Sequence, residues 1–244
     1  MKKIIYTICS SLLLLVSCSE SDEQIQNINL NPDGILVSKT IFSESPGEFY
    51  ESNYFYNGNK IDKIVSNNST EIFTYSGDLI VDITNYDNSI ISKRTYTYDS
   101  FGRVITSDFK YYAGDYESSE ELIYNADGTI TVKMKMGTLN NLYCNLGSEK
   151  LFLNELIIVK KEKYNSSNTL INTEDYYYDT KNSPFKNIIG YSKIQIPLYD
   201  RELSTNHNLV VSYLSYDYNS NDYLDKKNEL NPDGTIFSTT EYFY

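Results

Sequence analysis

Apolar and polar residues alternate with a period of two along much of this chain, a pattern typical of β-strands that bury one face. In the clearest case, Ile130, Val132 and Met134 alternate with the charged residues Lys133 and Lys135. Residues 50–56 and 104–111 show similar alternation. No stretch has the apolar stripe of an amphipathic helix. The pattern predicts an antiparallel sheet with one wet face.

Short clusters of Asn, Asp, Ser and Gly separate the predicted strands. A glycine tolerates the positive φ that tight hairpins require, and Asn or Asp side chains cap such turns. The clusters that contain Gly lie at 57–59, 76–78, 99–102, 125–128 and 231–234. Those without Gly lie at 165–168, 179–184 and 219–222. The spacing predicts successive hairpins.

The turns expose an internal repeat. Its unit is an aromatic residue, any residue, an aromatic residue, an Asx, a short turn, then a basic residue or Thr and an aliphatic residue. Tyr56, Tyr75, Tyr98 and Tyr124 mark successive units, 19, 23 and 26 residues apart. Each unit is therefore one strand–turn–strand hairpin of variable length.

These units predict an all-β fold, a long antiparallel meander of about 13 to 15 strands. A flat meander of that size would leave long unpaired edges, so we expect a curved sheet or a partly closed barrel around a Tyr-rich core. The least regular stretches, 137–150 and 181–208, could hold longer loops or a short helix.

The N-terminus has the features of a secretory signal. Lys2 and Lys3 precede an apolar run from 4 to 16 that is too short to span a bilayer comfortably. The run ends in Leu15-Val16-Ser17-Cys18, which resembles the bacterial lipobox. The resemblance implies cleavage before Cys18 and a lipid on its thiol, which would anchor the chain to a membrane. An ordinary secretory signal with a chance Cys is the alternative.

Three segments follow from this prediction: a signal peptide at 1–17, the lipidated Cys18 with a flexible acidic tether at 18–29, and a repetitive β-hairpin domain at 30–244. Glu20, Asp22 and Glu23 resemble the surface-export signal of Bacteroidota-type lipoproteins. The resemblance implies a lipid-anchored, surface-exposed outer-membrane protein. The periplasmic face of that membrane is the alternative location.

Two segments carry a wider resemblance. The unit formed by Tyr96, Tyr98, Asp99, Gly102-Arg103 and Val104 looks like a single YD (RHS-type) repeat. Residues 176–188 resemble a segment of Bacteroidota lipoproteins with a repetitive β domain, in which Tyr-x-Tyr-Asp-x-Lys-Asn precedes Pro-Phe-Lys-Asn. That family has no assigned reaction, and some related families look like porin-like sheets. The resemblance therefore implies a fold and a location, and no activity.

The amino-acid composition argues against several classes of function. The chain has 244 residues and a net charge of −12, and without Lys2 and Lys3 the charge is −14. Such an acidic chain is a poor nucleic-acid binder. A single His cannot build a multi-His metal site. Of three Cys, Cys9 leaves with the signal and Cys18 is lipidated, so Cys144 stands alone; its apolar neighbours predict a buried thiol.

The sequence gives little support for a catalytic site or a calcium site. His207 lies in a polar loop, and no Gly-x-Ser-x-Gly elbow is present. The carboxylate pairs Glu120–Glu121 and Glu174–Asp175 are adjacent on predicted strands, so their members point to opposite faces. Residues 217–228 place oxygen donors like a calcium loop, but Asp222 replaces the required Gly, which favours a solvated turn.

We therefore predict a non-enzymatic binding or interaction module, monomeric, with no cofactor or metal. Its partners would be the membrane, through the N-terminal lipid, and a glycan or protein ligand. The 25 Tyr could serve either the sheet core or an exposed glycan-stacking surface. A glycan-binding or glycan-processing surface lipoprotein is one alternative. A small outer-membrane β-barrel-like protein is another, although Lys, Asp and Asn interrupt both strand faces.

Overall fold

The computed structural model describes residues 34–44, 47–154, 157–196 and 206–244. The predicted signal peptide, Cys18 and the acidic tether lie outside these residues. The described chain is all-β, as predicted, and forms one antiparallel sheet of 15 strands. The strands are β1 (Lys39–Glu44), β2 (Glu48–Asn57), β3 (Lys60–Ser66), β4 (Thr70–Ser76), β5 (Leu79–Asp87), β6 (Ser89–Tyr98), β7 (Val104–Tyr111), β8 (Tyr116–Tyr124), β9 (Ile130–Thr138), β10 (Asn141–Asn154), β11 (Ile157–Tyr164), β12 (Leu170–Asp175), β13 (Leu214–Tyr218), β14 (Leu224–Leu230) and β15 (Ile236–Phe243).

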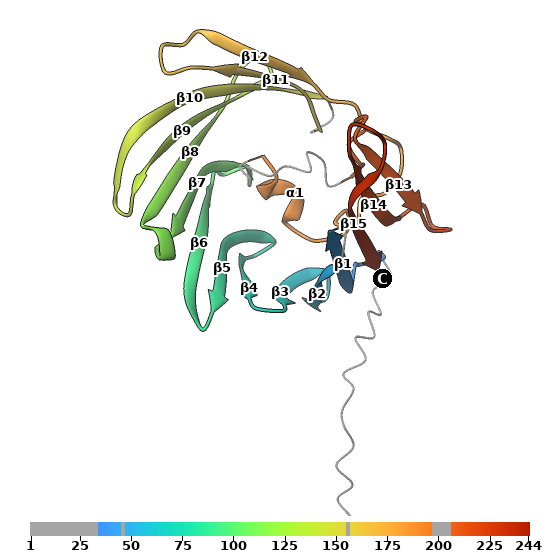
Figure 1. The fold of residues 1–244 in the computed structure, drawn as a ribbon. Helices are drawn as coiled ribbons and strands as arrows, with labels where there is room; N and C mark the ends of the chain where they lie inside the picture. Colours follow the sequence, from blue (N-terminus) through green and yellow to red (C-terminus); the bar gives the residue numbers. More distant parts are fainter. Residues whose placement is uncertain (1–33, 45–46, 155–156, 197–205) are drawn as a thin grey trace, which may run out of the picture.

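The sheet is a meander with one rearrangement. Strands β1 to β12 lie in sequence order, and β15, β14 and β13 continue the sheet on the other side of β1. The edges of the sheet are therefore β12 and β13, which do not pair with each other. The sheet curls strongly around the short helix α1 (Tyr191–Ile194), which lies inside the curve (Figure 1). This is the predicted curved sheet, and it is not closed into a barrel.

The predicted alternation of apolar and polar residues is clearest in β9. In β9, Ile130, Val132 and Met134 are buried, whereas Lys133 and Lys135 are exposed. The simple alternation predicted for 104–111 is interrupted, because a bulge follows Val104 and brings both Val104 and Ser107 to the buried face. The longer loop or short helix expected at 137–150 is wrong, since the end of β9, a tight turn and β10 occupy this stretch. Bulges after Leu142 and Asn145 account for its weak pattern.

The two ends of the sheet are different. One end carries the Asx turns between β2 and β3, β4 and β5, β6 and β7, and β8 and β9. There a Tyr at or just beyond the end of a strand donates its hydroxyl to the backbone carbonyl of a buried aliphatic residue near the start of an earlier strand. We call these residues the tyrosine ladder and this end the ladder end. The pairs are Tyr56 to Val37, Tyr98 to Ile80, Tyr124 to Val104, Tyr178 to Ile158 and Tyr244 to Leu224.

Tyr75 belongs to the same row and makes a different contact. Its hydroxyl accepts the N–H of Ile61 and donates to the carbonyl of Ile189, both at 3.2 Å. Ile189 lies in the segment before α1, so Tyr75 connects the sheet to the segment inside its curve. Burial raises the pKa of Tyr75 and of Tyr124 to about 12, because the ionised phenolate would lose its water.

Candidate functional site

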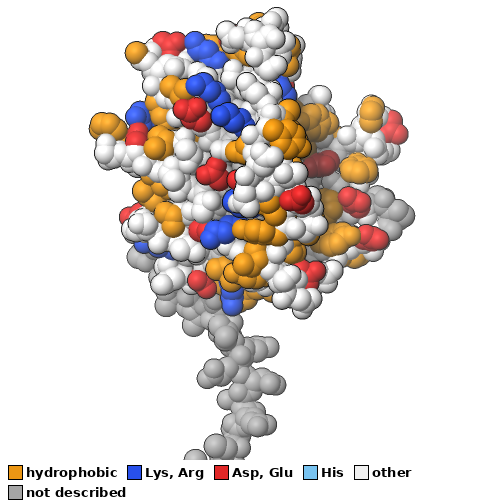
Figure 2. Space-filling view, turned by 90° about the vertical axis from the view of Figure 1, so that its left-hand side faces the viewer, with side chains coloured by type: hydrophobic (Ala, Val, Ile, Leu, Met, Phe, Trp, Pro, Cys, Tyr) orange, Lys and Arg blue, Asp and Glu red, His pale blue; other side chains and the backbone are white. Residues whose placement is uncertain are grey.

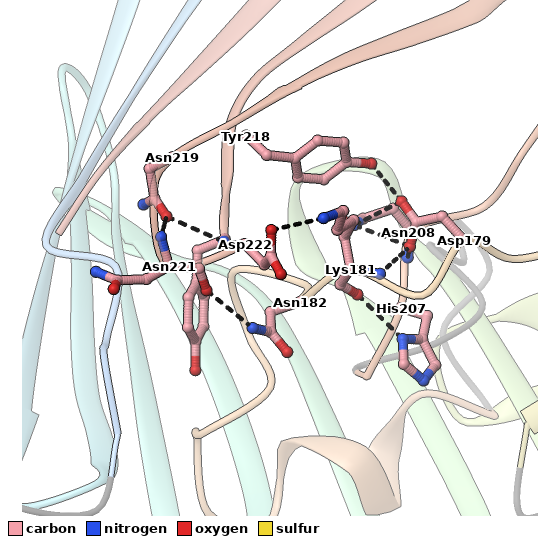
Figure 3. Close-up of polar contacts among 10 residues, drawn as sticks. Asp179, Lys181, Asn182, His207, Asn208, Tyr218, Asn219, Asn221 and Asp222 are labelled. Atoms are coloured by element: carbon pink, nitrogen blue, oxygen red, sulfur yellow. Dashed lines mark hydrogen bonds and ion pairs between the residues drawn. The ribbon is translucent and has the colours of Figure 1, made fainter.

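A cluster of polar side chains joins the two edges of the sheet at the ladder end. It lies where the chain leaving β12 meets the turn between β13 and β14 (Figure 3). The carboxylate of Asp179 accepts the backbone N–H groups of Lys181 at 3.0 Å and Asn208 at 3.1 Å, and also the hydroxyl of Tyr218. We call this set, with Asn182 and Asp222, the polar clasp.

In the other half of the clasp, Lys181 and Asn182 contact the β13–β14 turn. Lys181 Nζ lies 2.6 Å from Asp222 Oδ1, and Asn182 Nδ2 donates to the carbonyl of Asn221 at 3.2 Å. The backbone N–H of Asn182 donates to the carbonyl of Asp222 at 2.8 Å. A further bridge pairs Tyr178 with Leu209. The open sheet is thus fastened across its edges by side chains and short bridges, without a closing strand pair.

His207 contributes to the same region. Its ring is half-buried, and Nδ1 lies 3.0 Å from the carbonyl oxygen of Lys181. The sequence predicted a loop histidine without catalytic surroundings, and the structure places it against backbone beside the clasp (Figure 3).

The calcium-like stretch forms the β13–β14 turn, as predicted. Asn219 Oδ1 accepts the N–H groups of Asn221 and Tyr223, which is an Asx turn, and Asp222 is paired with Lys181. Asp222 has a φ of 62°, the left-handed conformation for which a calcium loop uses Gly. Over the described ranges, no group of three or more His, Cys, Asp or Glu side chains is placed to hold a metal ion.

The adjacent carboxylates point to opposite faces, as expected. Glu120 is buried on the concave face, whereas Glu121 is exposed with its carboxylate 3.5 Å from Lys133. Glu174 lies 3.0 Å from Lys161 and accepts the hydroxyl of Tyr176, and this hydrogen bond lowers the pKa of Glu174. Neither pair presents two carboxylates to one substrate position.

The sequence did not predict a layer of polar side chains on the concave face. Arg94 lies over the ring of Phe109 at 4.7 Å and donates to Ser107 at 2.9 Å. Tyr96 is buried next to it, and burial raises the pKa of both Tyr96 and Glu71. These residues alternate with convex ones in their strands, but the sequence does not show that the sheet curls far enough to enclose them.

Cys144 is exposed, so the predicted burial of its thiol is wrong. The reason is the backbone of β10, which has bulges on both sides of this residue. Its neighbour Tyr143 is 71% exposed. Local apolar neighbours suggested a core position, but this part of β10 lies at the end of the sheet that nothing in the described chain covers.

That end carries large hydrophobic side chains in solvent. They lie beside the hairpin turns opposite the ladder end, and several form pairs of consecutive residues. We call this set the hairpin rim. Its members are Phe49, Tyr50, Ile90, Tyr111, Tyr112, Leu142, Tyr143, Leu170, Ile171, Ile236 and Phe237. In the sequence these residues are apolar positions next to predicted turns, and nothing in the local pattern distinguishes them from core positions.

The remaining surface is mixed. Hydrophobic, acidic and basic side chains lie interspersed over the side shown in Figure 2. Ion pairs cross neighbouring strands, such as Lys93 with Asp82 at 2.6 Å and Lys226 with Glu241 at 2.9 Å. Within the described part of the chain, no helix is long and apolar enough to cross a membrane.

Comparison with known proteins identifies the fold. A porin-like protein from Bacteroides vulgatus has a TM-score of 0.57 at 13% identity, over 86% of this chain and 99% of that one. Another from Bacteroides uniformis has a TM-score of 0.45 at 12% identity, over 85% and 97%. A chain of the Tc holotoxin pore of Photorhabdus luminescens has a TM-score of 0.30 at 13% identity, over 78% and 9%.

Of these three similarities, the first alone has a TM-score above 0.5. At 13% identity it shows a shared fold and nothing more. The described chain, a curved and open antiparallel sheet, thus has a fold similar to that of a porin-like protein from Bacteroides. No protein-family model matches the chain, and no curated protein matches it.

Proposed function

We propose that this chain is a lipid-anchored cell-envelope protein that acts as a non-enzymatic interaction module. The observation that carries the proposal is the division of the sheet into two ends. At the ladder end, Tyr hydroxyls and the polar clasp hold the fold together. At the other end, the hairpin rim presents aromatic and aliphatic side chains to solvent. Monomeric proteins seldom expose large apolar patches without a function for them.

The membrane anchor is supported by the lipobox-like Leu15-Val16-Ser17-Cys18 and the acidic residues after it. The fold shared with a porin-like Bacteroides protein supports an outer-membrane location. We place the domain on the cell surface, with the periplasmic face as the alternative.

A binding role, as opposed to a catalytic one, is supported by the contacts that the carboxylates of the polar clasp and of β12 make. The side chains of Asp179, Glu174 and Asp222 are all engaged in contacts that hold segments of the chain together. Exposed rings of the rim, such as Tyr143 and Phe49, are instead available for recognition.

The anchor is tested by metabolic labelling with a palmitate analogue. We expect label in the wild type and none in Cys18→Ala, and equal labelling of both would refute the anchor. Protease shaving of intact cells then tests display. Cleavage of the wild type in intact cells supports surface exposure, whereas full protection supports the periplasmic side.

The interaction role is tested with the mature chain on a glycan array and in pull-downs from envelope extracts. The exposed Tyr of the rim are the reason to include glycans, because sugars stack on such rings. A rim variant, Phe49→Ser with Tyr143→Ser, should lose the captured ligand. Phe101→Ser, which removes an equally exposed ring at the ladder end, should keep it. Capture that survives the rim variant would contradict the proposal.

A further inference from the structure

Consecutive rim residues are exposed together, which is unusual for a sheet. Successive side chains of a strand point to opposite faces. Phe49 and Tyr50 are 66% and 47% exposed, and Leu170 and Ile171 are 50% and 55% exposed. Both faces of the sheet are therefore exposed to solvent at this end. The tips of these hairpins carry apolar side chains that no other part of the described chain covers.

The corresponding positions at the ladder end are buried. Ile80, Val104 and Leu224 are 0%, 0% and 1% exposed, although they too lie next to hairpin turns. The segment around α1 fills the curve beside them, since Tyr75 bonds to Ile189 and the N–H of Ile189 bonds to Asn59. At these hairpin positions the ladder end covers its aliphatic side chains, whereas the rim leaves its own in solvent; rings such as Phe101 and Tyr177 are exposed at the ladder end too.

We propose that the hairpin rim inserts its apolar side chains into the interfacial region of a lipid bilayer. This inference rests on the proposed function for the membrane anchor and names the partner of the rim. Tyr and Phe are suited to the bilayer interface, where a ring has an apolar body and, in Tyr, a polar tip.

The distribution of the rim favours a lipid surface over a protein partner. Its pairs lie on separate hairpins, from β14–β15 and β1–β2 through β7–β8 and β9–β10 to β11–β12, and so follow the whole length of the sheet. A protein hot spot is a compact cluster with a well-packed centre. An extended row of spaced apolar tips instead matches a broad, fluid surface that closes around each tip.

Charge indicates the kind of lipid. The chain after residue 17 carries a net charge of −14, and acidic residues such as Glu48 and Asp115 lie next to the rim. Repulsion from anionic headgroups is expected, so contact would depend on apolar insertion into neutral or zwitterionic lipid. Such binding is insensitive to salt, whereas electrostatic binding is screened.

The anchor and the rim can reach the same membrane. The described chain starts at the ladder end, where Asn187 Nδ2 donates to the carbonyl of Ile35 at 2.8 Å. The residues from 18 to 33 can span at most about 55 Å. A ten-residue strand such as β6 is about 33 Å long. The chain from residue 18 to 33 is therefore long enough for the domain to lie with its rim on the bilayer that holds its lipid.

The absence of Trp from the chain gives a clean test. We would prepare the chain from residue 18 onward with Cys18→Ser, so that no acyl chain contributes, and introduce one Trp by Phe237→Trp. Phosphatidylcholine vesicles should shift its emission to shorter wavelength, and brominated lipid should quench it, with little change at about 1 M salt. Phe101→Trp, at the ladder end, should show neither effect.

Vesicle flotation of the same chain gives the second readout. Phe49→Ser, Tyr143→Ser and Phe237→Ser together should lower the partition coefficient at least about tenfold. Phe101→Ser with Tyr177→Ser should leave it unchanged, and circular dichroism should show both variants folded. Equal flotation of the two variants, or no flotation of the parent, would overturn the inference.

Two other results would assign the rim to another partner. A parent chain that is dimeric in solution and becomes monomeric in the rim variant, without binding vesicles, would make a second copy the partner. Rim-dependent capture of a glycan or protein without vesicle binding would overturn the lipid partner and leave the proposed function standing. Failure of palmitate labelling would remove the anchor and leave the vesicle result interpretable by itself.

Discussion

The hydroxyl of Tyr56 donates a 2.7 Å hydrogen bond to the backbone carbonyl of Val37, a residue 19 positions earlier in the chain. Tyr124 makes the same bond to Val104 at 3.0 Å and Tyr244 to Leu224 at 2.7 Å, each 20 positions earlier. The acceptor is in each case a buried aliphatic residue. Three of the four repeat units, those of Tyr56, Tyr98 and Tyr124, thus each make one hydroxyl–carbonyl bond that holds the end of one strand against the beginning of another.

Tyr124→Phe should destabilise the domain by about 1 kcal/mol, because the carbonyl of Val104 loses its hydroxyl donor while the ring stays in place. Arg103 would still lie over the ring, as it does now at 4.1 Å. Urea unfolding followed by circular dichroism measures the change. Tyr112→Phe, on an exposed ring, is the control and should change stability by less than about 0.5 kcal/mol.

Alkaline pH should unfold the domain through the same row of Tyr. The pKa of Tyr75 and of Tyr124 is about 12 in the folded chain, because burial disfavours the phenolate, against about 10 when unfolded. The resulting stability is fully present below pH 10 and is lost as the pH rises to about 12. Absorbance at the phenolate band should show one group of Tyr titrating normally and another only with unfolding. Titration of every Tyr near pH 10 would contradict the burial of the row.

Asp179→Ala should weaken the polar clasp and cost about 2 to 3 kcal/mol, since two backbone N–H groups and the hydroxyl of Tyr218 lose a charged acceptor. Hydrogen exchange should become faster at 206–210 and 218–223, before any change in the strands from β3 to β9. Asp217→Ala, an exposed residue of β13, is the matched control. Unchanged exchange in Asp179→Ala would show that the clasp does not hold the two edges together.

Cys144 should react with a thiol reagent in the native protein, because its side chain is exposed. Complete modification without denaturant is the expected result, and Cys144→Ser should take up no label in a chain that starts at residue 18, and so lacks Cys9, and also carries Cys18→Ser. Reaction only after unfolding would restore the burial that the sequence suggested.

The sequence predicted the fold class because each hairpin carries its own local signal. The Asx turns are one example: Asp99 Oδ1 accepts the N–H groups of Phe101 and Arg103, and Asn165 Oδ1 accepts those of Ser167 and Thr169. Tyr98 and Tyr124 marked the strand ends for the same reason. These signals lie within a few residues of one another, so no knowledge of distant contacts was needed.

The clasp and the rim could not be predicted in this way. Asp179 meets Tyr218 across 39 positions, and only the curvature of the whole sheet brings them together. Whether Ile80 or Ile236 is covered depends on which end of the sheet receives the segment around α1, although both are aliphatic residues next to a turn. For Cys144 the bulges of β10 reversed the expected burial.

The central claim is that the ladder end stabilises the fold, whereas the hairpin rim contacts the lipid bilayer. Flotation of Phe237→Ser and Tyr124→Phe with phosphatidylcholine vesicles, in the unlipidated chain and at a urea concentration where both are folded, tests it most directly. We predict that Phe237→Ser lowers vesicle binding and that Tyr124→Phe, although less stable, binds like the parent. Equal binding by Phe237→Ser and the parent, or equal loss in both variants, would contradict the account.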